Sequence, residues 1–106
     1  MFGLGTKVPQ ISPSDLASQL KGEHPPLVID VRTIGEFRSG HIQGARLIPL
    51  GELAQRLNEI PKDQPVVTVC RSGSRSQMAA KQLKKEGYDV YNMTGGMMRW
   101  DGKTVR

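Results

Sequence analysis

The sequence predicts an α/β domain with a largely parallel sheet. Short apolar runs bounded by turn-forming residues recur along the chain, and segments with helical spacing of apolar residues separate them. The runs Leu27–Val31 and Val66–Val69 are almost uninterrupted, as expected of strands that are covered on both faces. Strands that alternate with helices in this order form parallel sheets with right-handed crossovers.

The first helix is predicted to begin after Ser12. Ser12 suits the N-cap, Pro13 suits the first helical position, and Asp15 falls three residues after the cap. Ile11, just before the cap, can pack on Leu16 as a hydrophobic staple.

The elements that follow are predicted from periodicity and turn residues. Leu53, Leu57 and Ile60 recur at helical spacing before Pro61. In chain order we expect a strand at Leu27–Val31, a short helix within Thr33–Ser39, a short strand within Ala45–Pro49, a helix at Gly51–Glu59, a strand at Val66–Val69, a helix at Ser74–Glu86 with Gly87 as its C-cap, a strand at Val90–Met93 and a last helical turn ending near Trp100.

Length and composition predict one domain. The chain has 106 residues, of which 37% are hydrophobic and 24% charged, so we expect a single domain over residues 1–106 with its core at about 7–101, folding as a monomer. No apolar run approaches the roughly 20 residues that a membrane span needs. The start of the chain has no signal-peptide pattern, so a cytoplasmic protein without a membrane partner is expected.

The net charge of +5 suggests an anionic partner. The basic residues are scattered, however, and few aromatic side chains are present to stack on bases. We therefore expect no nucleic-acid partner and favour attraction of small anions. The single cysteine and the two histidines show no metal-ligand spacing, so neither a metal nor another cofactor is predicted.

Cys70 is the candidate nucleophile. It ends the apolar run of VVTVCRSGSRS, where a strand meets the start of a helix, and sites in open α/β sheets lie at the carboxyl ends of strands. The small residues after it let backbone N–H groups turn inward as an anion-binding nest, which favours a thiolate. The alternative is that Cys70 is a small core residue, but Arg71 and Arg75 make a poor neighbourhood for the core. No second thiol is present to resolve an oxidised Cys70.

Several separated motifs resemble those of single-domain rhodaneses, a family of sulfurtransferases. They are Ile29-Asp30-Val31-Arg32, Glu36-Phe37, Gly40-His41-Ile42-Gln43-Gly44-Ala45, Ile48-Pro49, Val69-Cys70-Arg71-Ser72-Gly73-Ser74-Arg75-Ser76, and Gly95-Gly96 with Trp100. They run in order from about Ile11 to Trp100, nearly the whole chain.

The resemblance implies a rhodanese-like three-layer fold, with a mainly parallel five-stranded sheet flanked by helices. It also implies a thiosulfate sulfurtransferase that needs no cofactor. Cys70 would take the outer sulfur from thiosulfate or another persulfide donor as a persulfide. It would then pass the sulfur to cyanide, a thiol or a protein.

The remaining loop residues are expected to bind the anionic substrate. These are Arg71, Ser72, Gly73, Ser74, Arg75 and Ser76. Arg71 is expected to line the mouth, and by resemblance Arg75 holds the loop and the anion. The hydroxyls of Ser72, Ser74 and Ser76 either bind the persulfide or, for Ser74 and Ser76, cap the helix.

Polar residues outside the loop are given structural roles. The resemblance implies an ion pair between Arg32 and Glu36. Asp30, at a strand end, is expected behind the site. His41 is expected to make a structural hydrogen bond, because a thiolate that is already stabilised needs no base.

Three other functions remain open. The cysteine–arginine loops of phosphatases and arsenate-handling enzymes are one residue longer than the segment 71–74 found here, which suits a sulfane sulfur better than phosphate. A docking module is disfavoured because Cys70 is present. A persulfide relay to a protein partner keeps the same chemistry, and the short loop is expected to leave Cys70 open to such a partner.

Overall fold

The computed structural model describes residues 7–106. Residues 1–6 lie outside this range. They belong to the predicted domain and to the start of the chain, for which no signal peptide was expected. In chain order the elements are β1 (Gln10–Ile11), α1 (Pro13–Leu20), β2 (Leu27–Asp30), α2 (Ile34–Arg38), β3 (His41–Ile42), β4 (Arg46–Leu47), the 3-10 helices η2 (Leu50–Gln55) and η3 (Leu57–Glu59), β5 (Val66–Val69), α3 (Ser74–Lys85), β6 (Val90–Met93), the 3-10 helix η4 (Gly96–Arg99) and β7 (Thr104–Val105).

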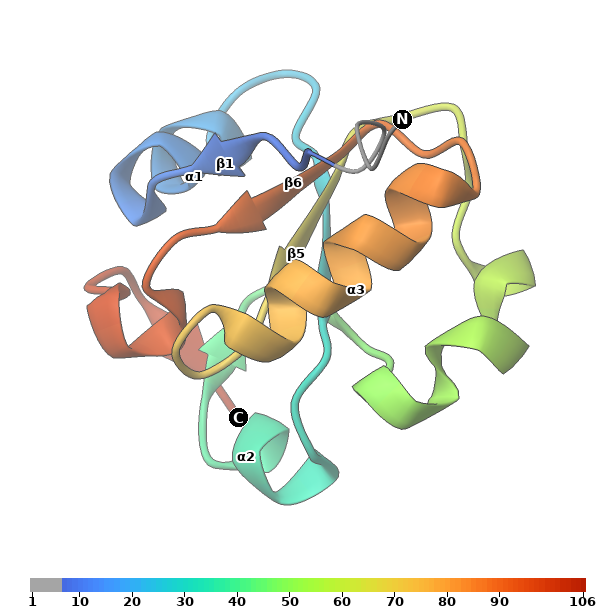
Figure 1. The fold of residues 1–106 in the computed structure, drawn as a ribbon. Helices are drawn as coiled ribbons and strands as arrows, with labels where there is room; N and C mark the ends of the chain where they lie inside the picture. Colours follow the sequence, from blue (N-terminus) through green and yellow to red (C-terminus); the bar gives the residue numbers. More distant parts are fainter. Residues whose placement is uncertain (1–6) are drawn as a thin grey trace.

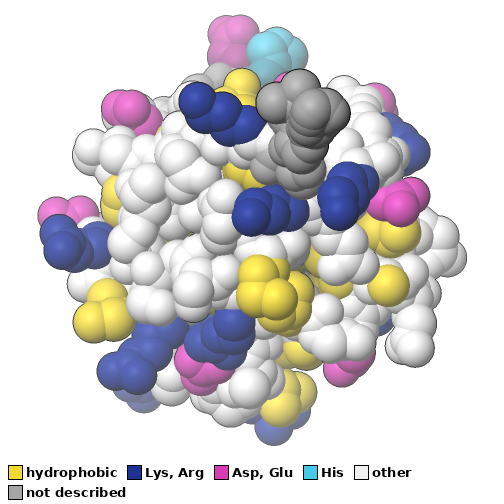
Figure 2. All heavy atoms as spheres, viewed as in Figure 1, with side chains coloured by type: hydrophobic (Ala, Val, Ile, Leu, Met, Phe, Trp, Pro, Cys, Tyr) yellow, Lys and Arg dark blue, Asp and Glu magenta, His cyan; other side chains and the backbone are white. Residues whose placement is uncertain are grey.

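The sheet has five strands in the order β1-β6-β5-β2-β4, and every pair in it is parallel. This confirms the predicted α/β class. In Figure 1, α3 crosses in front of β5, and α1 lies beside β1. Figure 2 shows that charged side chains of both signs are spread over this face. A separate antiparallel pair joins β3 to β7 and was not predicted, because two-residue strands carry no periodic signal.

The core lies on both faces of the sheet. Val66 packs with Ala79 and Leu83 of α3 on one face, while the next residue, Val67, packs with Leu16 of α1 on the other. Successive strand residues point to opposite faces, which explains why the central strands read as continuous apolar runs. Among residues 7–106, no helix is long and apolar enough to span a membrane.

The helix starts follow the local sequence where side chains can cap them. Ser12 Oγ accepts the N–H of Asp15 at 3.1 Å, as predicted for α1. Thr33 and Glu36 form a reciprocal capping box at α2. The end of α3 lies one residue before the predicted one: the helix ends at Lys85 with Glu86 as its C-cap, and Gly87 follows with a φ of +92°.

The predicted helix at Gly51–Glu59 is wrong. The segment forms η2 and η3 instead, interrupted at Arg56, whose φ is −120°. The backbone bonds run three residues back, as from Arg56 to Leu53 and from Glu59 to Arg56, which is the spacing of 3-10 turns. These turns place Leu53, Leu57 and Ile60 against the core cluster without a continuous α-helix. The hydroxyl of Tyr88 lies 3.0 Å from the carbonyl oxygen of Leu57 and 2.7 Å from that of Ile60, at the end of the segment.

Candidate active site

Cys70 follows β5 directly, at the carboxyl end of the central strand and ahead of α3. Figure 1 shows the connection from β5 to α3 passing close to the segment after β6. The Cys70 side chain is fully buried and packs with the apolar cluster that lies beneath α3. The expectation of an open cysteine is therefore wrong: the loop folds over the sulfur.

The loop surrounds the sulfur with hydrogen-bond donors. The N–H groups of Gly73 and Ser76 donate to Cys70 Sγ at 3.1 Å and 3.3 Å. Gly73 has a φ of +107°, a conformation that glycine adopts without strain, and this turns its N–H inward. The predicted nest is thus formed by backbone amides.

These contacts favour the thiolate. Burial by itself raises the pKa of Cys70, but the hydroxyl and amide of Ser76, followed by the amides of Gly73 and Ser72, outweigh it. The net result is a pKa below the ordinary thiol value. A deprotonated sulfur is the nucleophilic form of cysteine.

Ser76 stabilises the sulfur and does not cap α3. Its Oγ lies 3.2 Å from Cys70 Sγ and 3.1 Å from the carbonyl oxygen of Gly73. A hydroxyl has one proton, so it donates to Gly73 while the thiol donates to it, and it can turn to the sulfur once the thiol ionises. The N-cap of α3 is Gly73, without a side-chain cap, so the capping alternative for Ser74 and Ser76 is wrong.

Replacing Ser76 by alanine should raise the pKa of Cys70, because the strongest donor to the thiolate is lost while the amides remain. We expect alkylation by iodoacetamide at pH 7 to slow severalfold and its pH profile to move to higher pH. Ser74→Ala is the matched control, since Ser74 is exposed in the same loop. An unchanged profile in Ser76→Ala would show that the hydroxyl has no part in activating the sulfur.

Arg75 pairs with Glu36, which corrects the predicted partner of that carboxylate. Its two terminal nitrogens lie 2.8 Å and 2.9 Å from the two carboxylate oxygens of Glu36. The pair joins the second residue of α3 to α2, so it holds the start of the helix behind the loop. The guanidinium is thereby engaged by a carboxylate, while its position still lets the charge act on Cys70.

The Glu36–Arg75 pair should make stability fall in acid. Hydrogen bonds from Arg75, opposed by burial and aided by Thr33, lower the pKa of Glu36 from 4.5 to about 2. The stabilisation is therefore complete above about pH 4.5 and is lost as the pH falls towards 2. Because both side chains are about one-third exposed, we expect Glu36→Gln to cost only about 1–2 kcal/mol at pH 7.

Urea unfolding of wild type and Glu36→Gln at a series of pH values measures this effect. The difference between the two proteins should shrink to nearly zero at pH 2. Glu52→Gln is a suitable control, because Glu52 belongs to an exposed pair with Arg56. A difference that persists unchanged at pH 2 would contradict the assignment.

Arg32 pairs with Asp30, not with Glu36. Its Nε and terminal nitrogen lie 2.9 Å and 2.8 Å from the two carboxylate oxygens of Asp30, and both side chains are buried. The same terminal nitrogen donates to the carbonyl oxygen of Gly40 at 2.8 Å. Asp30, placed behind the site as expected, thus anchors the chain that leads from α2 to β3.

Arg32→Met should destabilise the fold by about 3 kcal/mol, because it leaves the carboxylate of Asp30 buried without its partner. Chemical unfolding followed by circular dichroism measures the loss. The double variant Asp30→Asn/Arg32→Met removes the unpaired charge and keeps an acceptor for the Arg32 backbone, so it should lose less. Equal losses in the single and double variants would argue against an electrostatic cause.

His41 has the structural role that was predicted. Its Nδ1 lies 2.9 Å from the carbonyl oxygen of Phe37, and the two rings stack with centroids 3.6 Å apart. It is not among the hydrogen-bond partners of Cys70. His41 therefore fixes β3 against α2.

The sequence reasoning assigned no role to the turn at Gly95 and Gly96, yet this turn supports the loop. The N–H groups that follow it, on Met97 and Met98, donate to the carbonyl oxygens of Cys70 at 2.8 Å and Arg71 at 3.0 Å. Both glycines have positive φ, and Gly96 lies directly against the Cys70–Arg71 backbone. In the sequence, the pair Gly95-Gly96 was the only indication that this turn has a special role.

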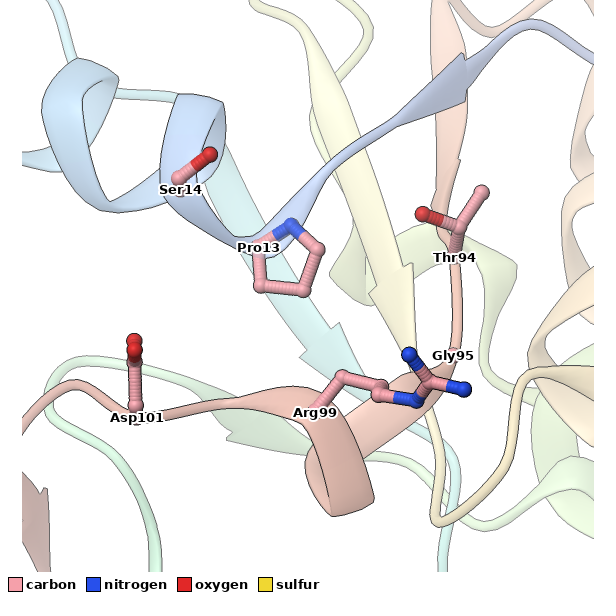
Figure 3. A pocket seen from close by; sticks show the side chains of 6 residues that line it. All are labelled: Pro13, Ser14, Thr94, Gly95, Arg99 and Asp101. Carbon is pink, nitrogen blue, oxygen red and sulfur yellow. The ribbon is translucent and has the colours of Figure 1, made fainter.

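Two cavities lie near this turn. The first, about 380 Å³, is lined by Arg32, Glu36, Ser39, Arg71, Met97 and Met98. Arg71 is exposed there, on the outer side of the loop. The second, about 500 Å³, lies between the start of α1 and the segment after β6, where Figure 3 shows Arg99 reaching beside Gly95 and Thr94. Cys70 itself lines neither cavity, and the first is the candidate mouth because Arg71, the next residue of the loop, lines it.

Residues 12–103, which include the loop after β5, match the model of the rhodanese-like domain. The chain belongs to this family. The rhodanese-like domain is 38% identical over 93% of its length to the putative sulfur carrier protein YrkF of Bacillus subtilis, and it spans 54% of that relative. It is 34% identical to the putative sulfurtransferase YtwF of the same organism, with 92% of this chain and 95% of YtwF covered.

Solved structures agree. The rhodanese-like domain superimposes on a rhodanese-like domain protein from Staphylococcus aureus with a TM-score of 0.85 at 33% identity, covering 91% of this chain and 93% of that one. A protein named sulfurtransferase from Allochromatium vinosum is 38% identical to this chain, with 88% of each covered. Among residues 7–106, no cluster of three side chains suited to a metal is found.

Proposed function

We propose that this protein is a thiosulfate sulfurtransferase that carries sulfur as a persulfide on Cys70. The observation that carries the proposal is the surroundings of the buried sulfur: the amides of Gly73 and Ser76 donate to it. The hydroxyl of Ser76, 3.2 Å away, can also donate to it once the thiol has ionised. They lower the pKa of the thiol. They also suit a second sulfur anion bound next to the first.

The reaction has two displacement steps at sulfur. In the first, the Cys70 thiolate attacks the outer sulfur of thiosulfate, a new S–S bond forms, and sulfite leaves with the electrons of the broken S–S bond. In the second, a thiophile such as cyanide attacks the outer sulfur of the persulfide. Its lone pair forms the new bond to sulfur, and the electrons of the S–S bond return to Cys70 as thiolate.

The electrostatics of the site favour an anionic donor. Arg71 is exposed beside the candidate mouth, and Arg75 lies near enough for its charge to act on Cys70. The net charge of +5 adds a general attraction for anions. Since Cys70 is buried, the narrow end of a donor such as thiosulfate fits this site better than a bulky group does.

The acceptor in this proposal is either a small thiophile or a protein thiol, and neither a nucleic acid, a membrane nor a cofactor takes part. A protein acceptor makes the chain a persulfide relay. Met98, 66% exposed in the lining of the candidate mouth, and Arg71 beside it offer such a partner an apolar and a basic contact. The protein acts as a monomer in the cytoplasm.

Intact mass spectrometry tests the proposal. Thiosulfate should add one sulfur atom to the purified protein, and cyanide should remove it as thiocyanate. Hydrolysis of an aryl phosphate, without any gain of sulfur, would instead support the oxyanion alternative and overturn the proposal. If thiosulfate adds nothing but a persulfidated protein donor does, the relay is the function and small-molecule turnover is excluded.

A further inference from the structure

A third cavity, lined by residues of α1, β3 and the segment after η4, shares no lining residue with the candidate mouth. Its volume is about 450 Å³, within the range of small-molecule sites. The end of α1 contributes Ala17, Leu20 and Lys21, and the two segments on the other side contribute Ile42, Trp100 and Lys103. None of the sulfur chemistry described above uses this cavity.

The wall formed by Trp100 is held in place by its own neighbours. The indole Nε1 donates to the carbonyl oxygen of Lys103 at 3.3 Å. Gly102 lies flat against the ring, since a Cβ on this residue would come within 2.7 Å of Cζ2. The Trp100 backbone N–H donates to Met97. A wall that is fixed before binding loses little freedom when a ligand arrives.

The buried part of the cavity lining is apolar, and its exposed rim carries two lysines. Ile42 is buried, Leu20 and Trp100 are partly buried against the same apolar cluster, and Lys21 and Lys103 are exposed. Within residues 7–106, neither lysine forms an ion pair, and no acidic residue lines the cavity. Asp101, next to Trp100 in sequence, lines the adjoining cavity in Figure 3.

We propose that this cavity binds a small amphipathic anion, a free carboxylate or sulfonate with an apolar chain or ring. The apolar part contacts Leu20, Ile42 and the indole of Trp100, where its burial supplies the hydrophobic contribution. The acid group lies near Lys21 and Lys103, so it stays partly hydrated while it gains attraction from both charges. The inference does not depend on sulfur transfer, because every group it uses lies outside the loop of Cys70.

The test uses the intrinsic fluorescence of Trp100, the only tryptophan of the chain. Octanoate, kept below its micelle concentration, should change the Trp100 emission in a saturable way and give a matching heat in isothermal titration calorimetry. Octyltrimethylammonium has the same chain with the opposite charge and should bind roughly tenfold more weakly or worse. Equal titrations by the two ligands, or no saturable signal with octanoate in either method, would overturn the proposal.

Variants locate the site. Lys21→Glu/Lys103→Glu should weaken octanoate binding by roughly tenfold or more. The control Lys81→Glu/Lys85→Glu makes the same change in net charge on the exposed face of α3 and should bind like wild type. Ala17→Phe fills the cavity without changing the charge, so it should also abolish binding.

Further outcomes would contradict this location. One is that Lys21→Glu/Lys103→Glu binds octanoate with the same affinity as the control Lys81→Glu/Lys85→Glu. Octanoate binding that is weakened by Arg71→Ala as much as by Lys21→Glu/Lys103→Glu is another, because it would place the anion beside the loop of Cys70. Circular dichroism and thermal unfolding of each variant verify that the fold is kept.

Discussion

Cys70→Ser should abolish sulfur transfer, with thiocyanate formation falling by at least about a thousandfold and no sulfur added by thiosulfate. A serine hydroxyl cannot form a persulfide, and the chain contains no other cysteine to replace it. Because serine is slightly smaller and keeps the contact with Ser76, the fold should be retained. Thermal unfolding within a few degrees of wild type would establish this.

A comparison of Cys70→Ser with Arg71→Ala separates the transfer of sulfur from the binding of thiosulfate. Arg71 is exposed at the candidate mouth, so its loss should raise KM for thiosulfate more than it lowers kcat. Turnover by Cys70→Ser within tenfold of wild type would refute the persulfide mechanism, whatever the behaviour of Arg71→Ala.

Gly96→Ala should cost about 4 kcal/mol or more and remove most of the activity. Its φ of +63° is strained for any residue with a Cβ, and the added Cβ would lie 2.6 Å from the carbonyl oxygen of Cys70 and overlap the carbonyl group of Arg71. The turn would have to move away from the loop. The hydrogen bonds from Met97 and Met98 that hold the loop would then be broken.

Gly35→Ala is the matched control. Gly35 lies inside α2, and a Cβ there meets nothing within 4 Å. Alanine in a helix is favoured over glycine, so this variant should be stabilised by up to about 1 kcal/mol. Chemical unfolding gives the stability of both variants, and thiocyanate formation gives their activity. A Gly96→Ala protein as stable as Gly35→Ala would show that the turn can adapt.

The sequence predicted most of the regular structure, and its failures have physical causes. Val66–Val69 and Val90–Met93 form strands at the predicted bounds, because runs that are apolar on both faces of a strand are a local signal. The segment Gly51–Glu59 did not form its α-helix, because 3-10 turns also place Leu53 and Leu57 against the core, and the spacing of apolar residues does not distinguish the two. The strands β1, β3 and β7 have two residues each, too few to show a period.

The candidate site was predicted in composition but not in its contacts. The position of Cys70 at the end of a strand follows from the local pattern, as does the nest made possible by Gly73. The family resemblance implied an ion pair between Arg32 and Glu36. The structure gives the two charges different partners, Asp30 for Arg32 and Arg75 for Glu36.

The sequence by itself therefore determined the order of strands and helices, the N-cap of α1 and the place of the cysteine, because each depends on residues within a few positions of one another. Tertiary structure decided the burial of Cys70, the partner of Glu36 on α3, the support of the loop by Gly96, and the cavity beside Trp100. These features join segments far apart in the chain. Their energies depend on which surfaces the packed sheet brings together, and no local periodicity records that choice.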